Sequence, residues 1–161
     1  MSVTIRPATV DDAALILGFI RELAIYEKAE HEVIASEADI ARNLFAHDGP
    51  ARALIVDADG IHIGFAVYFY SYSTWLGRKG LYLEDLYISP AHRGHGAGKQ
   101  VLRYLAQLAV SQGCGRFEWS VLDWNEPAIR FYRAIGAVPQ DEWVRYRMAG
   151  ENLKRFAQSE D

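Results

Sequence analysis

The sequence predicts an α/β fold of the α+β kind, in which helices cover a mixed sheet. Two features predict it: an N-terminal half rich in hairpin signals, and a C-terminal half in which strands and helices alternate. The length of 161 residues favours one domain, which at this size needs neither a disulfide nor a metal to fold. We expect that domain to span residues 1–150, followed by a polar tail at 151–161.

The beginning of the chain predicts one short strand and two helices. Residues 3–6 form the strand, which a proline closes. Thr9 and Asp12 have the spacing of a capping box, and the apolar residues that follow up to Tyr26 keep helical spacing. Ser36 begins a second helix with the same kind of cap. We therefore expect both helices to start at a capping residue.

Two apolar runs further along the chain predict a hairpin. Residues 51–58 and 61–70 are joined by Asp59-Gly60, a dipeptide typical of two-residue hairpin turns. A turn at 75–78 leads into another strand at 80–89, which is rich in leucine and tyrosine. These strands are expected to form most of the sheet.

The rest of the chain alternates between helices and strands. We expect a helix after Gly98, a strand at 116–122, a helix from Asn125 to Gly136 and a last strand at 143–148. The polar tail predicts a frayed helix or coil.

Composition excludes several classes of protein. The net charge of −4 argues against a general nucleic-acid binder and suits a cationic substrate. No apolar run approaches the roughly 20 residues of a membrane span, and the start of the chain has no signal-peptide pattern. The single cysteine, Cys114, excludes an internal disulfide framework and favours a cytoplasmic location. The histidines lack metal-ligand spacing, so no metal is expected.

A glycine-rich turn between a predicted strand and helix is the most informative segment. Gly94, Gly96 and Gly98 let backbone N–H groups point one way, and Arg93 and Lys99 add positive charge. Together with the helix N-terminus they predict a phosphate or diphosphate site, although a plain tight turn is the alternative. The spacing fits neither a nucleoside triphosphate loop nor a dinucleotide fingerprint.

A second group of residues follows the next strand. Asn125 caps a helix, and Tyr132 lies two turns later on the same side of it. Taken alone, this pattern is a capped helix with a half-buried tyrosine. Together with Arg93-x-x-Gly96-x-Gly98 it resembles the GNAT superfamily of acyl-CoA-dependent N-acetyltransferases.

The resemblance extends from residue 3 to residue 148. Within the superfamily, the chain is similar to the spermidine/spermine (diamine) acetyltransferase family. The segments that carry it are 5–9, 22–27, 81–85 and 124–127. It implies a GNAT-type mixed, mostly antiparallel sheet with helices on both faces, acetyl-CoA as co-substrate, and a homodimer. The chain departs from the family pattern at the short loop 57–61 and at 118–120, which leaves the acceptor open.

The resemblance also implies which residues form the site. Acyl-CoA would contact Leu86, Tyr87, Ile88, Arg93, Gly94, His95, Gly96, Ala97, Gly98, Lys99, Asn125, Glu126, Pro127, Ala128 and Tyr132. The acceptor pocket would include Tyr26, Glu27, Glu84, Asp85, Glu118, Trp119, Ser120, Glu142 and Trp143. The acidic members of this pocket suit a substrate with more than one positive charge.

Acetyl transfer to an amine requires two proton movements. An alkyl ammonium has a pKa of about 10.4, so a base must remove its proton, and Glu84 is the candidate, directly or through water. Tyr132 is the candidate acid that protonates the leaving thiolate. A backbone N–H of Leu86 or Tyr87 is expected to stabilise the oxyanion. We favour direct attack in a ternary complex over a covalent route through Cys114.

The expected activity is transfer of the acetyl group of acetyl-CoA to a primary amine of a small cationic molecule, such as a polyamine, diamine or lysine analogue. A protein or peptide N-acetyltransferase is one alternative and would need an open groove. A non-catalytic acyl-CoA-binding module is another, and the presence of both Glu84 and Tyr132 argues against it. Neither nucleic acid nor a membrane is an expected partner.

Overall fold

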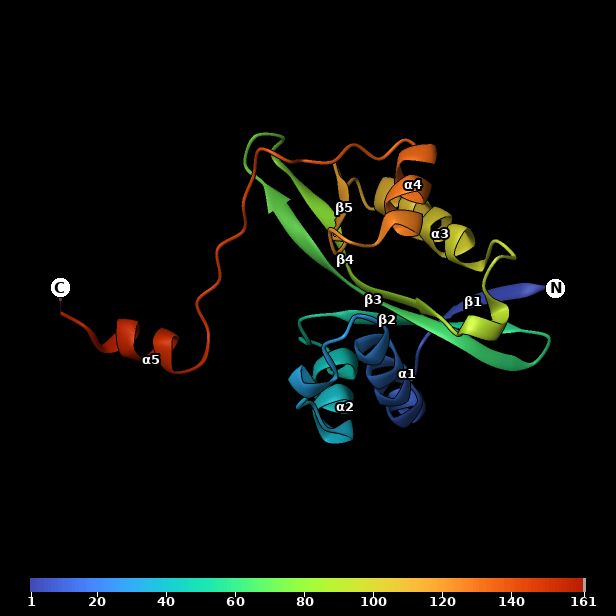
Figure 1. The fold of residues 1–161 in the computed structure, drawn as a ribbon, viewed down its shortest axis with the longest axis horizontal. Coiled ribbons are helices and arrows are strands. Elements are labelled where there is room, and N and C mark those ends of the chain that lie inside the picture. Colours follow the sequence, from blue (N-terminus) through green and yellow to red (C-terminus); the bar gives the residue numbers. More distant parts are fainter. Residues whose placement is uncertain (161) are drawn as a thin grey trace. The chain divides into compact units, whose positions relative to one another are not determined.

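The computed structural model describes residues 1–160 (Figure 1). Their contacts divide the chain into two compact units, Met1–Leu122 and Asp123–Asp161. The first unit holds the whole sheet, and the second holds two short helices and the irregular chain between them. The single domain over residues 1–150 stays a prediction.

The sheet of the first unit is a meander with one parallel strand at its edge. Its strands follow the order of the sequence, β1-β2-β3-β4-β5. The first four pair antiparallel, and β5 pairs parallel with β4. The strands are β1 (Val3–Pro7), β2 (Arg52–Ala58), β3 (Ile61–Ser73), β4 (Arg78–Ile88) and β5 (Phe117–Trp119). The predicted mixed, mostly antiparallel sheet is therefore confirmed, with β5 shorter than expected.

Helices cover both faces of this sheet, as predicted (Figure 1). On one face lie α1 (Ala13–Tyr26) and α2 (Glu37–Phe45), and on the other lies α3 (Ala97–Ser111). Short 3-10 turns at Val10–Asp12, Glu30–Glu32 and Pro90–His92 complete the unit. Helix α3 is amphipathic because only one side of it packs against the sheet. The buried residues on that side are Ala97, Val101, Leu102, Leu105 and Ala109.

The predicted hairpin turn and the cap of α2 are confirmed, while Thr9 with Asp12 caps the 3-10 turn that leads into α1. The Thr9 backbone N–H donates to the Asp12 carboxylate at 2.8 Å, just before α1. Ser36 and Asp39 form a reciprocal capping box at the start of α2. Asp59-Gly60 joins β2 to β3 with positive φ at both residues, which is the geometry of a tight hairpin.

The core beneath α1 and α2 is aromatic at its centre. The ring of Phe19 stacks on that of Phe65 at 5.8 Å and lies 5.9 Å from that of Tyr87. Phe65 is on β3 and Tyr87 on β4, so this contact fixes α1 over the middle of the sheet.

The second unit contains α4 (Glu126–Ala134) and α5 (Gly150–Gln158). The predicted strand at 143–148 is wrong: these residues are irregular and exposed, because none of the described strands pairs with them and an unpaired extended segment has no ladder to hold it. The tail, expected as frayed helix or coil, forms α5, and Asp161 lies outside the described residues.

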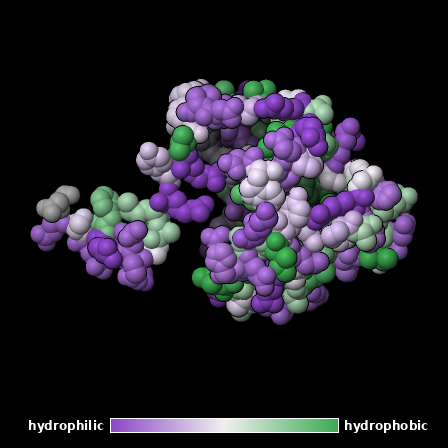
Figure 2. Space-filling view, viewed as in Figure 1, coloured by the Kyte–Doolittle hydropathy of each residue, from purple (hydrophilic) through white to green (hydrophobic). Residues whose placement is uncertain are grey.

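The visible face of the structure in Figure 2 is largely hydrophilic, with hydrophobic residues scattered over it. Among the residues that the structure describes, no helix has the length and hydropathy that crossing a bilayer requires.

Candidate active site

A β-bulge at Glu84 interrupts strand β4. Leu83 lies opposite Tyr68 on β3, and Asp85 lies opposite Val67, so Glu84 is the extra residue without an opposite partner. Directly opposite residues of an antiparallel pair share a face of the sheet. Because Tyr68 and Val67 are on opposite faces, Leu83 and Asp85 are too. A regular strand would place them on the same face.

The bulge turns Asp85 toward α1. Val67 belongs to the core cluster that packs against α1 and α2, so Asp85 is on that face of the sheet. Burial, followed by the nearby charges of Glu84 and Glu27, raises the pKa of Asp85 to about 7. Partial burial and the charge of Glu84 also raise the pKa of Glu27, the residue that ends α1. These three predicted pocket residues therefore lie together, and we call them the acidic group.

A bound cation would stabilise the acidic group. Ionising three neighbouring carboxyls concentrates negative charge, and part of that charge is removed from water. An ammonium or guanidinium placed among them offsets this repulsion and lowers the pKa values again. The chemistry of the group therefore favours a positively charged ligand.

The outer edge of β4 is open beyond the bulge. Strand β5 pairs with β4 only at Leu81–Leu83, and no other described strand pairs with β4 on that side. A Cβ added to Gly64 on β3 would collide with the Tyr87 carbonyl oxygen, so the backbone groups of Tyr87 face β3. Since this direction alternates along a strand, the N–H and C=O of Leu86 face the open edge, as do those of Ile88.

The glycine-rich turn has the geometry of an anion cradle. Gly94 and Gly96 both adopt a φ of 82°, and Gly96 is the N-cap of α3. The first intrahelical bond runs from the Gln100 N–H to the Gly96 carbonyl, so the N–H groups of Ala97, Gly98 and Lys99 have no acceptor within the helix.

This cradle has room for a ligand. A Cβ added at Gly94, Gly96 or Gly98 would meet no atom within 4 Å. Open space over free N–H groups at a helix N-terminus fits a diphosphate such as that of acetyl-CoA.

The Arg93 side chain contacts both α1 and β4. Its Nε donates to the Ile88 carbonyl oxygen at 2.6 Å. Its guanidinium carbon lies 5.0 Å from the centre of the Tyr26 ring and 5.3 Å from that of Tyr87. Arg93 thus bridges α1 and β4 at the surface. His95 and Lys99 are also exposed, in the loop and at the start of α3.

The predicted residues on and after β5 lie beside the bulge. Trp119 is opposite Leu83, the residue before Glu84, and its ring lies 4.9 Å from that of Phe117. The Ser120 and Tyr82 hydroxyls are 2.8 Å apart. Glu118 is half-buried on β5, opposite Tyr82. Their departure from the family pattern therefore falls next to the acidic group.

The other predicted site residues belong to the second unit. Asn125 caps α4 and accepts from the Ala128 N–H at 3.4 Å, and Pro127 occupies the first turn beside Glu126. Tyr132 is half-buried on the same helix. The predicted cap and the tyrosine are thus brought onto one helix, while Glu142 and Trp143 are exposed in the irregular chain that follows.

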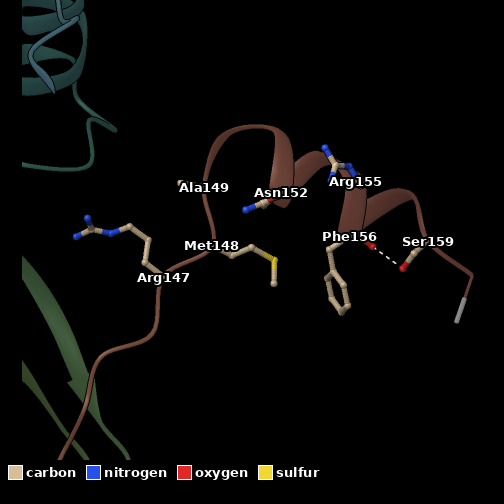
Figure 3. A pocket seen from close by; sticks show the side chains of 7 residues that line it. All are labelled: Arg147, Met148, Ala149, Asn152, Arg155, Phe156 and Ser159. Atoms are coloured by element: carbon tan, nitrogen blue, oxygen red, sulfur yellow. Dashed lines mark hydrogen bonds between the residues drawn. The ribbon is translucent and has the colours of Figure 1, made fainter. Parts of the chain in front are cut away.

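A pocket in the second unit contains none of the predicted site residues (Figure 3). Met148 and Phe156 point to the same side of it, and the Ser159 hydroxyl donates to the Phe156 carbonyl at 2.9 Å. The other lining residues are Arg147, Ala149, Asn152 and Arg155. This hollow holds no pair of groups suited to acyl transfer.

Comparison with known families decides among the chemistries that this geometry allows. Residues 19–137 match the family model described as Acetyltransferase (GNAT) family, which spans most of both helical faces, the cradle and α4. The chain belongs to the GNAT acetyltransferase family. It is accordingly an acetyl-CoA-dependent N-acetyltransferase, and the predicted family, fold and co-substrate are confirmed.

Relatives of this GNAT protein are similar over nearly their full length. The thialysine N-epsilon-acetyltransferase of Mus musculus is 36% identical, over 97% of this chain and 98% of its own. The L-ornithine N5-acetyltransferase of Arabidopsis thaliana is 30% identical, over 93% and 86%. A solved integron cassette protein from the mobile metagenome of V. cholerae has a TM-score of 0.82 at 29% identity, covering 99% of both chains.

Sequence reasoning missed three features of the site. The bulge at Glu84 has no glycine or proline at or directly beside it, and the one glycine of its strand, Gly80, lies four residues earlier. The close approach of β3 to the Tyr87 carbonyl is possible because residue 64 is a glycine, and its only sign in the sequence is a glycine within an apolar run. The contacts of Arg93 with α1 had no local signal, since Tyr26 is far away in sequence.

Among residues 1–160 no group of three or more His, Cys, Asp or Glu is arranged to hold a metal ion.

Proposed function

We propose that this N-acetyltransferase acetylates a primary amine of a small molecule that carries at least one further positive charge, such as a diamine, a polyamine or a lysine analogue. The acidic group of Glu27, Glu84 and Asp85 is the observation that carries the proposal. A second charged group on the acceptor would pair with carboxyls that the reacting amine does not use.

The named substrates of the relatives support the same class. Thialysine and ornithine, the substrates in the names of the two enzymes above, each carry a side-chain amine and an α-amino group. One amine would react while the other is held. We rank a lysine analogue and an ornithine-like diamine first, and polyamines after them.

Glu84 is proposed as the base. It is exposed at the bulge, next to the open edge of β4 where an acyl group would lie. Its carboxylate takes the proton of the incoming ammonium, directly or through one water, so that the nitrogen lone pair becomes free to attack. Asp85 and Glu27 hold the second charge of the acceptor.

Backbone and loop groups of the first unit hold the co-substrate in this proposal. The N–H of Leu86 faces the open edge and donates to the oxygen that becomes negative when the amine nitrogen bonds to the thioester carbon. Ile88 continues the same edge. The diphosphate lies on the free N–H groups of Ala97, Gly98 and Lys99.

Tyr132 is proposed as the acid. As the carbon–sulfur bond breaks, its hydroxyl gives a proton to the leaving thiolate, which balances the proton taken by Glu84. Asn125 to Ala128 begin the same helix and are proposed to contact the co-substrate. The amine attacks directly in a ternary complex, and Cys114 forms no acyl intermediate.

A thiol-release assay with acetyl-CoA tests the substrate class. The acceptors are thialysine, lysine, ornithine, a simple diamine, spermidine, a monoamine of the same length and short peptides. We expect kcat/KM to be highest for the acceptors with two cationic groups and lowest for the monoamine. Equal values for the monoamine and the diamine would refute the role of the acidic group.

The tyrosine has its own test. Tyr132→Phe should lower kcat by about 10–1000-fold, because it removes the proton donor while keeping the ring. Its Kd for CoA should stay the same. An unaltered kcat at saturating substrates would remove Tyr132 from the mechanism.

We further propose a homodimer, a cytoplasmic location and a single domain over residues 1–150. The family resemblance supports the dimer, and the single cysteine supports a reducing compartment. Light scattering at micromolar concentration tests the first of these, and a monomer mass would contradict it.

A further inference from the structure

We propose that the side chain of Arg93 is a positioning residue for the acceptor end of the site and not a ligand of the diphosphate. It joins the last turn of α1, which carries Tyr26 and Glu27, to the end of β4. The inference rests on the proposed function, because it assigns α1 to acceptor binding.

Three contacts define the position of the guanidinium. Its Nε donates to the Ile88 carbonyl on the open edge of β4 at 2.6 Å. The group lies near the face of the Tyr26 ring at 5.0 Å and of the Tyr87 ring at 5.3 Å, both within the range of a cation–π contact. Arg93 therefore bridges a helix and a strand that are far apart in sequence.

The neighbouring contact of Tyr87 extends this connection along α1. The Tyr87 hydroxyl donates to the Glu22 carboxylate at 3.4 Å, one turn before Tyr26. Tyr87 is buried, while Tyr26 is 42% exposed. Arg93 therefore contacts both a ring at the surface, on α1, and a ring of the core, on β4.

This arrangement leaves the diphosphate to other groups. The Nε of Arg93 is bound to Ile88, and the guanidinium carbon lies over two aromatic rings, so these contacts hold the group against the strand and α1. The free N–H groups of the cradle and the side chain of Lys99 remain available. Removing the Arg93 side chain should therefore disturb the acceptor more than the co-substrate.

Two acetyl donors separate the two roles. Acetyl-pantetheine has the same thioester as acetyl-CoA but no diphosphate. If Arg93 positions α1, Arg93→Ala should raise the KM of the diamine and lower kcat/KM by about 10–100-fold with both donors alike, as expected for a misplaced binding group. The Kd of CoA, measured by calorimetry, should change less than about threefold.

Lys99→Ala is the matched control. It removes one positive charge from the other end of the cradle, so its loss should be larger with acetyl-CoA than with acetyl-pantetheine. If Arg93→Ala behaves like Lys99→Ala, with weakened CoA binding and a smaller loss with acetyl-pantetheine, the proposal is overturned.

Variants of the ring partner keep the test valid if Arg93→Ala is poorly folded. Tyr26→Leu should lower Tm by about as much as Arg93→Ala does. Tyr26→Phe should lower Tm less than Tyr26→Leu, because it keeps the ring. The double variant Tyr26→Leu/Arg93→Ala should have a Tm no lower than that of either single variant. Strictly additive effects on Tm would contradict the contact. This cycle tests the contact without turnover. If no acceptor in the panel is acetylated, the Kd of CoA decides, because a loss of CoA affinity in Arg93→Ala as large as that in Lys99→Ala overturns the proposal.

Discussion

Asp85→Asn should remove a pH dependence from the stability of the fold. Burial, with the charges of Glu84 and Glu27, raises the pKa of Asp85 from 3.8 to about 7 in the folded chain. An unfolded aspartate ionises near pH 3.9, so between about pH 4 and pH 7 the unfolded state releases a proton that the folded state keeps. Stability therefore falls as the pH rises through this window and levels off above it. Asparagine, which resembles the protonated acid in shape, does not titrate.

The size of the effect follows from the same pKa values. Each pKa unit corresponds to about 1.4 kcal/mol, so the interval from pH 5 to pH 7 gives at most about 3 kcal/mol. Partial solvent exposure of the carboxyl reduces this, and we expect about 1–3 kcal/mol. For a chain of this length that corresponds to a Tm difference between Asp85→Asn and the unaltered protein that grows by about 2–10 °C from pH 5 to pH 8.

Thermal and urea unfolding of both proteins at pH 5, 6, 7 and 8 measures this difference. Asp141→Asn, at an exposed position of the second unit, is the matched control and should show no such trend. If the difference between Asp85→Asn and the unaltered protein is the same at all four pH values, the carboxyl titrates at its ordinary pKa and the reasoning about the acidic group fails.

Four further substitutions test three other features of the structure. Glu84→Gln should lower the pKa of Asp85, because it removes the nearest like charge, and NMR titration of the Asp85 carboxyl carbon would measure it. Gly96→Ala should lower the free energy of unfolding by about 1–2 kcal/mol, because φ is 82° there. Gly98→Ala lies inside α3, so it should raise the free energy of unfolding by up to about 1 kcal/mol while weakening CoA binding by filling the cradle. Urea unfolding measures the first effect and calorimetry the second. Ser36→Ala should cost about 1 kcal/mol by removing the cap of α2, and an unchanged urea midpoint would show that the cap contributes nothing.

The parts of the fold that the sequence predicts well are those with local causes. Thr9 with Asp12, Ser36 with Asp39, and Asp59-Gly60 each act within a few residues, and the structure contains all three as predicted. The cradle is similar, because its glycine spacing and the following helix are neighbours in the chain. Local hydrogen bonds and positive φ values leave clear signatures in sequence.

Features that depend on distant partners were harder to predict. Residues 143–148 alternate as a strand does, but a strand forms only where another strand accepts its hydrogen bonds, and none of the described strands does so. The direction of the Arg93 side chain depends on Tyr26 and Tyr87, which are on other elements. Charge and loop position alone suggested a diphosphate ligand there.

The acidic group shows most clearly why alternation is not enough. Read as a regular strand, β4 places Asp85 on the same face as Leu83, away from Glu84 and from α1. One extra residue in the strand shifts the register by one, and such a shift moves every later side chain to the other face. As a result Leu83 shares a face with Tyr68, while Asp85 and Tyr87 face α1 with its terminal Glu27. The bulge therefore does two things at once: it brings the carboxyls together, and it does so where β4 loses its neighbour β5 and its backbone becomes available to an acyl group.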